Sequence, residues 1–341
     1  MTEGILWAIF AGLMLGLYAL PEKFTKGFKY ENTWSLFFLL TMFVVPIIAS
    51  LLLIEGFGEI FGNMPTDIWV KMGLASFLWG IGVMMWSKAI NHIGLSLGFS
   101  IFIGTIILVG SLLPFIVDGL PPTNVLTFVL IGILVVLLGV ILNGKAGLTR
   151  EKDEGKLNAA QNTVSDKGSM TTGILIAVVG GLLATGFSYA NAVGRPYLHE
   201  ASIGQGNADW ITAVAIMFPI FISGGIVMTA YFLWQLNKKK AWGDFKTASF
   251  SKNFMLILVM AVFHYAASAL FAYAAYKLGA SGNTVGYAIF NTASVATAII
   301  SGIVTSEWVK ASPKARNFLY TGLACMIIGI IIIAYGNGQA F

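Results

Sequence analysis

The sequence predicts an all-α integral membrane protein of ten transmembrane helices, arranged as two inverted five-helix repeats. Of the 341 residues, 57% are hydrophobic and 10% are charged, whereas soluble domains are about 25% charged. The apolar residues form about ten runs, each close to the ~20 residues that a helix needs to cross hydrocarbon. Motifs of the first half recur in the second, which predicts the repeat.

The expected spans follow one another through short connections. Backbone amides find no water in lipid, so an apolar run of this length must satisfy its hydrogen bonds internally, as a helix. The first run is expected to remain as a spanning helix and not to act as a signal peptide, because its lysines follow the apolar residues instead of preceding them. The spans are expected at residues 4–20, 34–54, 69–87, 94–117, 124–143, 171–192, 210–235, 253–276, 283–304 and 317–336.

The third and fourth spans predict a tight helical hairpin, with the polar bridge 87–92 as its turn. Trp79 lies near the middle of the third span, deeper than the interfacial belt where tryptophan usually collects. Gly94 and Gly98 open the fourth span with a small-xxx-small pattern that lets another helix approach closely.

A hydrophilic segment, 144–170, divides the chain into a first repeat, 1–143, and a second, 171–341. Its mixture of Lys, Glu, Asp, Asn, Gln and Gly cannot bury apolar area, which predicts a mobile cytoplasmic linker. The cytoplasmic side follows from charge, since seventeen of the twenty Lys and Arg residues fall in the odd-numbered loops. By the positive-inside rule, both termini are expected on the outer side of an inner (plasma) membrane.

The internal repeat is carried by residues whose offsets rise slowly along the chain, from 169 to 190 residues. Because five is an odd number, the second unit must enter the membrane in the opposite orientation. Inverted repeats commonly place a substrate site near the midplane, exposed alternately to each side, so the repeat predicts a transporter. The matched pairs are Gly4 with Gly173, Gly12 with Gly181, Gly94 with Gly282, Gly98 with Gly286, Phe102 with Phe290, Gly132 with Gly322, and Gly139 with Gly329. Gly94, Gly98, Gly282 and Gly286 are the expected helix-packing positions.

The chain resembles the L-rhamnose/proton symporter family of the drug/metabolite transporter superfamily over nearly its whole length. The motifs that carry the resemblance are Trp79-Gly-Ile-Gly82, Gly94-x-Ser96-x-Gly98 with Gly104, Gly110 and Pro114, Tyr30-Glu-Asn-Thr-Trp34, Arg195-Pro196 with His199-Glu200, Gly224-Gly225, and Glu307-Trp308. The resemblance implies ten helices in inverted repeats, a sugar substrate and uptake driven by an ion gradient.

The expected function is therefore import of a neutral monosaccharide, such as the deoxysugar L-rhamnose, by proton symport with alternating access. Sodium coupling stays open, as do a metabolite exporter of the same superfamily and a non-transporting sensor or scaffold. No cofactor is expected besides the ion gradient, and the expected partners are a sugar and the lipid bilayer, without nucleic acid or an obligate protein partner. The absence of catalytic and metal-binding motifs in the sequence argues against an enzyme and a metal site.

His264 is the proton-coupling candidate. All fifteen Asp and Glu residues fall in loops or at span ends, whereas His264 lies near the centre of the eighth span. An ionisable group at that depth is functional by default, and imidazole changes charge in the physiological range. A sugar contact and a structural hydrogen bond are the alternatives for this residue.

Candidate sugar contacts are polar or aromatic residues inside the spans. The Asn291 amide must find a partner in hydrocarbon, either a sugar hydroxyl or another helix. Trp79 and Tyr265 offer flat faces for a pyranose ring and polar tips for its hydroxyls, with core packing as the alternative. Further candidates are Thr105, Tyr18, Tyr189, Asn191 and Tyr287.

Glu31 and Glu307 are the gate candidates. Each is placed at a cytoplasmic helix end with lysines nearby in the sequence. A solvated ion pair explains such positions as well, whereas a buried proton site does not fit them.

Overall fold

The computed structural model of this chain describes residues 2–93, 95–112, 119–120, 122–158, 170–279, 282–306, 308–309 and 311–338. Throughout these residues the regular structure is helical, without strands. Nine of the described helices are long and apolar enough to cross a membrane, so this is a multi-pass membrane protein.

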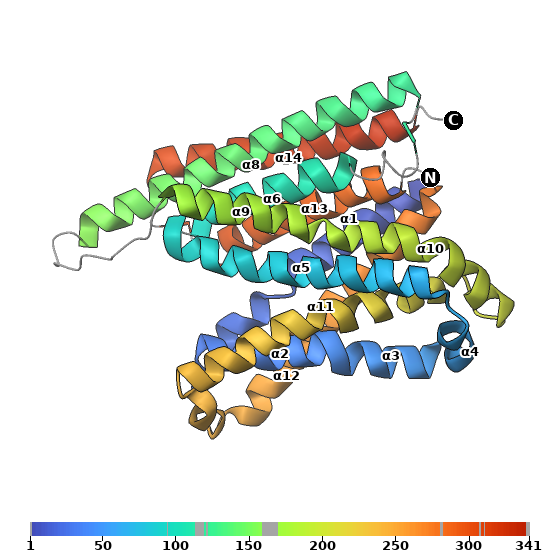
Figure 1. Ribbon diagram of the computed structural model, residues 1–341. Coiled ribbons are helices and arrows are strands. Elements are labelled where there is room, and N and C mark those ends of the chain that lie inside the picture. Colours follow the sequence, from blue (N-terminus) through green and yellow to red (C-terminus); the bar gives the residue numbers. More distant parts are fainter. Residues whose placement is uncertain are drawn as a thin grey trace.

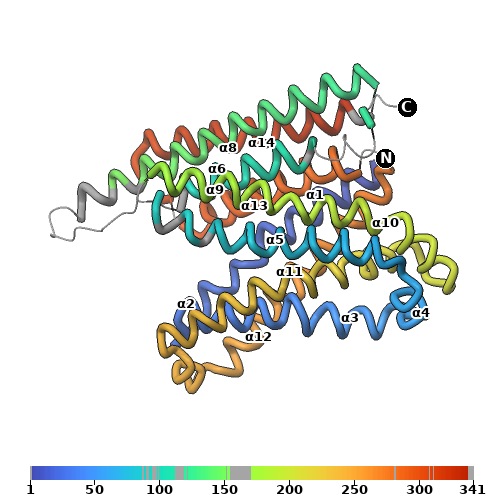
Figure 2. Tube along the Cα trace, in the orientation of Figure 1, coloured from blue at the N-terminus to red at the C-terminus, as the bar shows by residue number. Residues whose placement is uncertain are grey.

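The helical bundle has two distinct ends (Figure 1). Both chain termini lie at one end, together with the short helix α4 (Phe57–Gly62), and we refer to it as the terminal end. The other, the basic end, carries the connections 25–29 and 239–249, which together contain five lysines. The Cα trace shows the long helices running between these two ends (Figure 2).

The first half contains two breaks, each next to a proline. Pro21 has no amide hydrogen for the Leu17 carbonyl, so α1 ends there and a 3₁₀ turn follows. Pro46 likewise follows a π-helical turn that interrupts the second span. The elements are α1 (Thr2–Leu17), η1 (Leu20–Phe24), α2 (Tyr30–Leu39), η2 (Leu40–Val44), α3 (Val45–Leu53), α4, α5 (Thr66–Ile93), α6 (Leu95–Leu112) and α8 (Thr123–Asn158).

The second half has corresponding long helices with breaks of its own. Thr185 separates α9 from α10, and its side chain donates a hydrogen bond to the Leu182 carbonyl. A π-helical turn, η6, precedes α13. The elements are α9 (Met170–Ala184), α10 (Gly186–Gly204), α11 (Ile211–Lys238), η4 (Ala241–Phe245), α12 (Phe250–Lys277), η6 (Gly282–Gly286), α13 (Tyr287–Val304) and α14 (Pro313–Gly338).

Two connections differ from the expectations. The polar bridge 87–92 is helical, because α5 continues to Ile93 instead of turning. Helix α8 likewise continues to Asn158, so the expected mobile linker 144–170 begins with helix. Nine of the fifteen residues from 144 to 158 are Lys, Leu, Glu, Ala or Arg, whose high helix propensities allow a helix to extend beyond its apolar part despite three glycines. Residues 159–169 lie outside the described part of the chain.

The two halves of the chain interlock. Helix α1 packs on α12 and α13 of the second half, while α9 packs on α5 and α6 of the first. Helices α8 and α14 lie side by side along much of their length (Figure 1). The largest buried cluster lies between the halves and includes Met42, Phe221 and Phe271. Neither half therefore encloses this core alone.

Glycines allow the backbones of α8 and α14 to touch. A Cβ atom at Gly139 would lie 2.7 Å from the Gly322 carbonyl oxygen, and one at Gly132 would lie 3.0 Å from the Gly329 carbonyl oxygen. Likewise, a Cβ at Gly322 would lie 2.8 Å from the Gly139 carbonyl oxygen, and one at Gly329 would lie 2.9 Å from the Gly132 carbonyl oxygen. Lipid gives no hydrophobic reward for helix pairing, so this close van der Waals contact is what holds the two helices together.

Candidate functional site

A cavity of about 630 Å³ lies at the centre of the bundle, between helices of both halves. Its volume is in the range of sites that enclose small molecules. Most of its wall is aromatic or aliphatic, and hydrogen-bonding groups are few. The side chains on its wall that carry a polar atom are Tyr18, Glu22, Tyr30, Trp34, Trp79, Trp86, His264, Ser268, Tyr287, Asn291 and Ser294.

His264 reaches the cavity from the middle of α12. Its Nδ1 lies 3.1 Å from the Thr41 hydroxyl oxygen, and that hydroxyl donates a hydrogen bond to the Ala261 carbonyl at 3.2 Å. Because a hydroxyl has only one hydrogen, Nδ1 is then the donor to Thr41, and Nε2 is left as an acceptor. The imidazole packs against Tyr18 and Phe37, with ring centroids 5.0 and 5.5 Å away.

Trp79 forms the aromatic wall on the α5 side. Its indole packs at 5.2 Å from the Phe187 ring and 5.8 Å from the Phe221 ring. Gly224 on α11 makes room for the indole, since a Cβ there would lie 2.6 Å from its Cε3 atom. The ring is therefore fixed in place, as a stacking surface for a ligand must be.

Helix α13 brings three polar side chains to the cavity. Tyr287, Asn291 and Ser294 recur at intervals of four and three residues and so share one helical face. The Asn291 amide donates to the Tyr287 carbonyl at 2.9 Å, which holds this side chain against its own helix.

Glu22 places a carboxylate on the cavity wall. The 3₁₀ turn that Pro21 imposes after α1 carries Glu22 toward α2, where the Trp34 indole N–H donates to its Oε1 at 2.8 Å. The residue is partly buried, and it lies within the last residues of the first candidate membrane span. A carboxylate in such surroundings is exceptional and is a candidate for function.

The cavity reaches the surface at the basic end. Tyr30, the first residue of α2, lines the cavity and is 52% exposed. Toward the terminal end the space is closed by aromatic rings, since Phe271 packs on Tyr287 at 5.5 Å and on Phe187 at 5.9 Å.

A polar cluster follows the aromatic layer toward the terminal end. The Arg195 guanidinium donates to the Asn283 Oδ1 at 2.7 Å and to the Ala275 carbonyl at 3.3 Å. The Asn191 amide donates to the same Oδ1 at 2.9 Å. The cluster ties α10 to η6 and to the end of α12.

Comparison with known proteins identifies the family. Residues 1–340 match the family described as L-rhamnose-proton symport protein (RhaT). The chain belongs to this family. Two similar proteins, from Escherichia coli and from Citrobacter koseri, are each named L-rhamnose-proton symporter. Each is 24% identical to this chain over 98% of both sequences.

Membership in the L-rhamnose-proton symport family agrees with the resemblance found in the sequence. The relatives are named as transporters and not as enzymes, and the apolar helices fit a transporter. Among the described residues, no group of three or more His, Cys, Asp or Glu side chains could hold a metal ion.

The sugar candidates of this family member divide into two sets. The cavity wall includes five of them: Trp79, His264, Asn291, Tyr18 and Tyr287. The other four are not on that wall: Tyr265, Thr105, Tyr189 and Asn191. Whether any of the nine binds sugar remains a prediction.

Physical reasons account for the four that lie elsewhere. Tyr265 follows His264 by one residue, or about 100° around α12, and lines a second, mainly apolar cavity with Trp210. Thr105 faces α9 and donates to its own Ile101 carbonyl at 2.8 Å. Asn191 belongs to the polar cluster at Arg195, and Tyr189 lies away from the central cavity on the same helix, α10.

Glu22 and Trp34 contribute polar groups to the rim of the cavity, but neither was predicted from the sequence as a site residue. One signal was available, because Glu22 follows the candidate Tyr18 by only four residues. Their contact depends on the path of the chain between α1 and α2, which no sequence spacing reveals.

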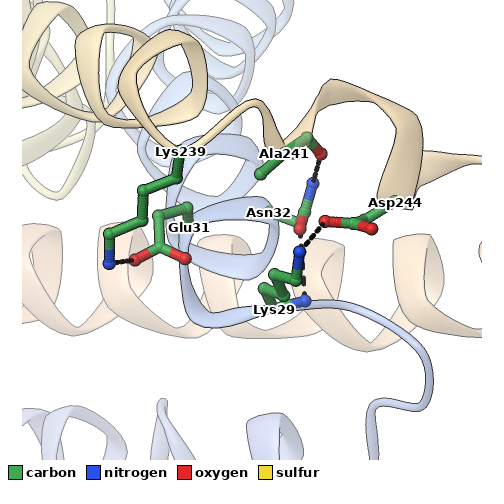
Figure 3. A network of polar contacts seen from close by, with 6 residues as sticks. All are labelled: Lys29, Glu31, Asn32, Lys239, Ala241 and Asp244. Carbon is green, nitrogen blue, oxygen red and sulfur yellow. Dashed lines mark hydrogen bonds and ion pairs between the residues drawn. The ribbon is translucent and has the colours of Figure 1, made fainter.

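The gate candidate Glu31 forms an ion pair with Lys239 at the basic end (Figure 3). The Glu31 side chain is 7% exposed and that of Lys239 is 54% exposed. Beside this pair, Lys29 pairs with Asp244 at 2.9 Å, and Asn32 donates to the Ala241 carbonyl at 2.8 Å. The contacts join the start of α2 to the end of α11 and to η4, and so join the two halves.

Some predicted positions lie outside the described residues, namely the second gate candidate Glu307 and the packing candidate Gly94. Gly98 is buried. Gly282 lies directly against the Ala275 backbone, and a Cβ at Gly286 would lie 3.0 Å from Leu278. The packing role of these glycines remains a prediction, which the close approach of η6 to α12 supports.

Proposed function

We propose that this protein imports a neutral deoxysugar such as L-rhamnose together with protons, by alternating access. The observation that carries the proposal is the central cavity, found in a member of the L-rhamnose-proton symport family. Its rings at Trp79 and Tyr287 suit the C–H face of a pyranose, while His264, Asn291 and Ser294 suit its hydroxyls.

Alternating access requires two halves that can rock against each other, and the contacts support ten spans in two inverted repeats. Helix α1 packs on the second half as α9 packs on the first. A Cβ at Gly12 would lie 2.7 Å from the Phe290 carbonyl oxygen, and one at its repeat equivalent Gly181 would lie 2.9 Å from the Phe102 carbonyl oxygen. Phe102 and Phe290 are themselves equivalent, as a two-fold relation requires. On this proposal, α6 supplies the tenth span.

The basic end is the cytoplasmic side of an inner membrane on this proposal, and both termini lie outside. The support is the concentration of lysines in the connections at this end, which the positive-inside rule assigns to the cytoplasm. The cavity reaches that end through Tyr30 and is closed toward the other by Phe187, Phe271 and Tyr287. The described conformation then corresponds to the state that releases sugar inward.

The driving force on this proposal is a proton gradient, without a bound cofactor. The support is the name of the relatives, L-rhamnose-proton symporter. A hard cation such as Na⁺ would need several oxygen ligands, whereas the cavity wall is mostly apolar.

Transport by the purified protein in liposomes tests the function. With an acidic outside and an alkaline inside, labelled L-rhamnose should accumulate, and a protonophore should abolish the accumulation. If a sodium gradient drives the accumulation instead, the coupling ion is Na⁺ and not the proton. If neither gradient drives uptake of any monosaccharide that raises the protein's melting temperature, the proposal is wrong.

A further inference from the structure

Two glutamates near the basic end have different surroundings. Glu31 is buried but has a cation, Lys239, as its partner. Glu22 lines the central cavity and receives one hydrogen bond, from the neutral Trp34 indole at 2.8 Å. In the described part of the chain, no cation forms an ion pair with Glu22.

Of the three lysines that follow Glu22 closely in the sequence, Lys23 and Lys29 have other partners. Lys23 donates to the Thr305 hydroxyl at 2.9 Å, beyond the end of α13, and Lys29 pairs with Asp244 on η4. The titratable groups that share the cavity with Glu22 are Tyr18 after α1, Tyr30 on α2, His264 on α12 and Tyr287 on α13. Of these, only His264 gains a positive charge on protonation, and the three tyrosines are neutral near pH 7.

An unpaired carboxylate in a mostly apolar cavity favours protonation when water leaves. A charged carboxylate removed from water without a cation costs far more free energy than its neutral acid. A sugar that enters the cavity displaces water from around Glu22 and so favours the acid. By reciprocity, the proton on Glu22 then favours the sugar, which is the linkage that symport requires.

We propose that Glu22 carries the coupled proton, and that the Trp34 N–H positions its carboxylate at the rim of the sugar cavity. This inference rests on the sugar-import function proposed above. Glu22 takes one proton from water on the outer side, becomes the neutral acid while sugar is bound, and returns that proton to water on the cytoplasmic side. No other bond forms or breaks. His264, with Nδ1 held by Thr41, then serves the sugar through Nε2.

Binding of L-rhamnose measured against pH tests this assignment. The dissociation constant of the wild-type protein should rise with pH by up to about tenfold per pH unit, as for one linked proton. Glu22→Gln resembles the neutral acid, so its affinity should stay nearly constant with pH. In liposomes this variant should still exchange labelled for unlabelled sugar but should lose accumulation driven by the proton gradient.

Two variants serve as controls. Glu3→Gln changes an exposed carboxylate at the far end of the same candidate membrane span and should keep the wild-type pH dependence. His264→Gln should bind sugar more weakly, with the pH dependence retained. If Glu22→Gln keeps the wild-type pH dependence, or His264→Gln loses it, the assignment to Glu22 is overturned. Absence of sugar binding by the wild-type protein at every pH would instead overturn the proposed function.

Trp34→Phe tests the positioning role and does not require a change at Glu22. The phenyl ring keeps most of the packing with Tyr18 and Phe37 but has no N–H to stabilise the carboxylate. The pH at half-maximal uptake should therefore move upward, with sugar binding at low pH retained. An unchanged pH profile would exclude the proposed role of Trp34.

Glu22→Asp, which keeps an acid, should retain part of the gradient-driven uptake. A complete loss of this uptake would count against a proton carried by residue 22.

Discussion

Side chains on the cavity wall combine fixed rings with a few hydrogen-bonding groups. The Trp79 ring is held by Phe187, Phe221 and the space above Gly224, and the His264 ring by Thr41 and its aromatic neighbours. Ordered rings lose little further entropy when a ligand binds, so their contact energy is available for affinity. If the cavity binds sugar as proposed, these rings are preorganised at the residue scale for the C–H face of a pyranose.

Trp79→Ala removes one of these rings and should weaken sugar binding by about 1.5 kcal/mol, or roughly tenfold. Titration calorimetry with L-rhamnose measures the change. Trp79→Phe keeps an aromatic face and should recover most of the affinity. Equal binding by the alanine variant and the wild type would remove Trp79 from the site.

His264 and Tyr265 are adjacent residues on α12 that line different cavities, so substitutions at the two positions can be compared. His264→Ala and Asn291→Ala should each reduce uptake, because each removes a hydrogen-bonding group from the cavity wall. Tyr265→Phe should leave uptake within about twofold, because Tyr265 lines a different cavity and its hydroxyl donates to the Val214 carbonyl at a long 3.4 Å. Uptake assays on membranes with matched protein levels decide, and a larger loss for Tyr265→Phe than for His264→Ala would contradict this placement.

Helix pairs show how small residues shape the structure at the element scale. Helices α8 and α14 meet through Gly132 and Gly139 on one side and Gly322 and Gly329 on the other. In the repeat, Gly132 is equivalent to Gly322 and Gly139 is equivalent to Gly329. In the structure, however, Gly132 contacts Gly329 and Gly139 contacts Gly322. This crossed pattern arises because the two helices run in opposite directions.

Gly139→Ala tests this contact. The new Cβ would meet the Gly322 carbonyl oxygen at 2.7 Å, so the helices must separate, at about 1–3 kcal/mol. The melting temperature of the purified protein should fall. The control is Gly104→Ala on α6, where the new Cβ would meet only side chains at 3.7 Å and where alanine favours helix. A melting temperature lowered equally by both changes would refute the close contact as the cause.

At the scale of the whole molecule, polar contacts at the basic end join the two halves. The pair of Glu31 with Lys239 and the pair of Lys29 with Asp244 connect α2 to the α11–η4 connection (Figure 3). If the halves rock during transport, these contacts must change their free energy between the two states.

Glu31→Gln should therefore lower the rate of uptake while sugar affinity stays the same. The expected effect is about 1 kcal/mol, or severalfold in rate, because Lys239 is half exposed and solvent screens the pair. Exchange of the two charges, Glu31→Lys with Lys239→Glu, should restore part of the rate. A rate unaffected by Glu31→Gln would show that the pair has no part in the transport cycle.

The orientation in the membrane can be measured with single cysteines in a Cys325→Ala background. In intact cells, a membrane-impermeant thiol reagent should label Glu3→Cys at the terminal end, which the proposal places outside. The same reagent should label Lys240→Cys at the basic end only after the membrane is opened. The reverse pattern would place the lysines outside and contradict the positive-inside assignment.

The sequence by itself determined that this chain is an all-helical membrane protein, near which residues most of its spans lie, and to which family it belongs. Apolar runs of this length must form helices in lipid, and a polar group such as His264 or Asn291 stands out against them. The continuation of α5 through residues 87–92 and of α8 to Asn158 was not predicted, because helix ends depend on local capping and packing as well as on hydropathy.

Only the tertiary structure decided which of those side chains share a cavity. His264 and Tyr265 are neighbours in sequence, yet the rotation of the helix sends them to different cavities. Glu22 reads as a loop residue by hydropathy, but the turn after α1 places it against Trp34 on the cavity wall. The physical reason is that composition fixes how deeply a segment lies in the membrane, while the direction in which a side chain points depends on packing between helices that are distant in sequence.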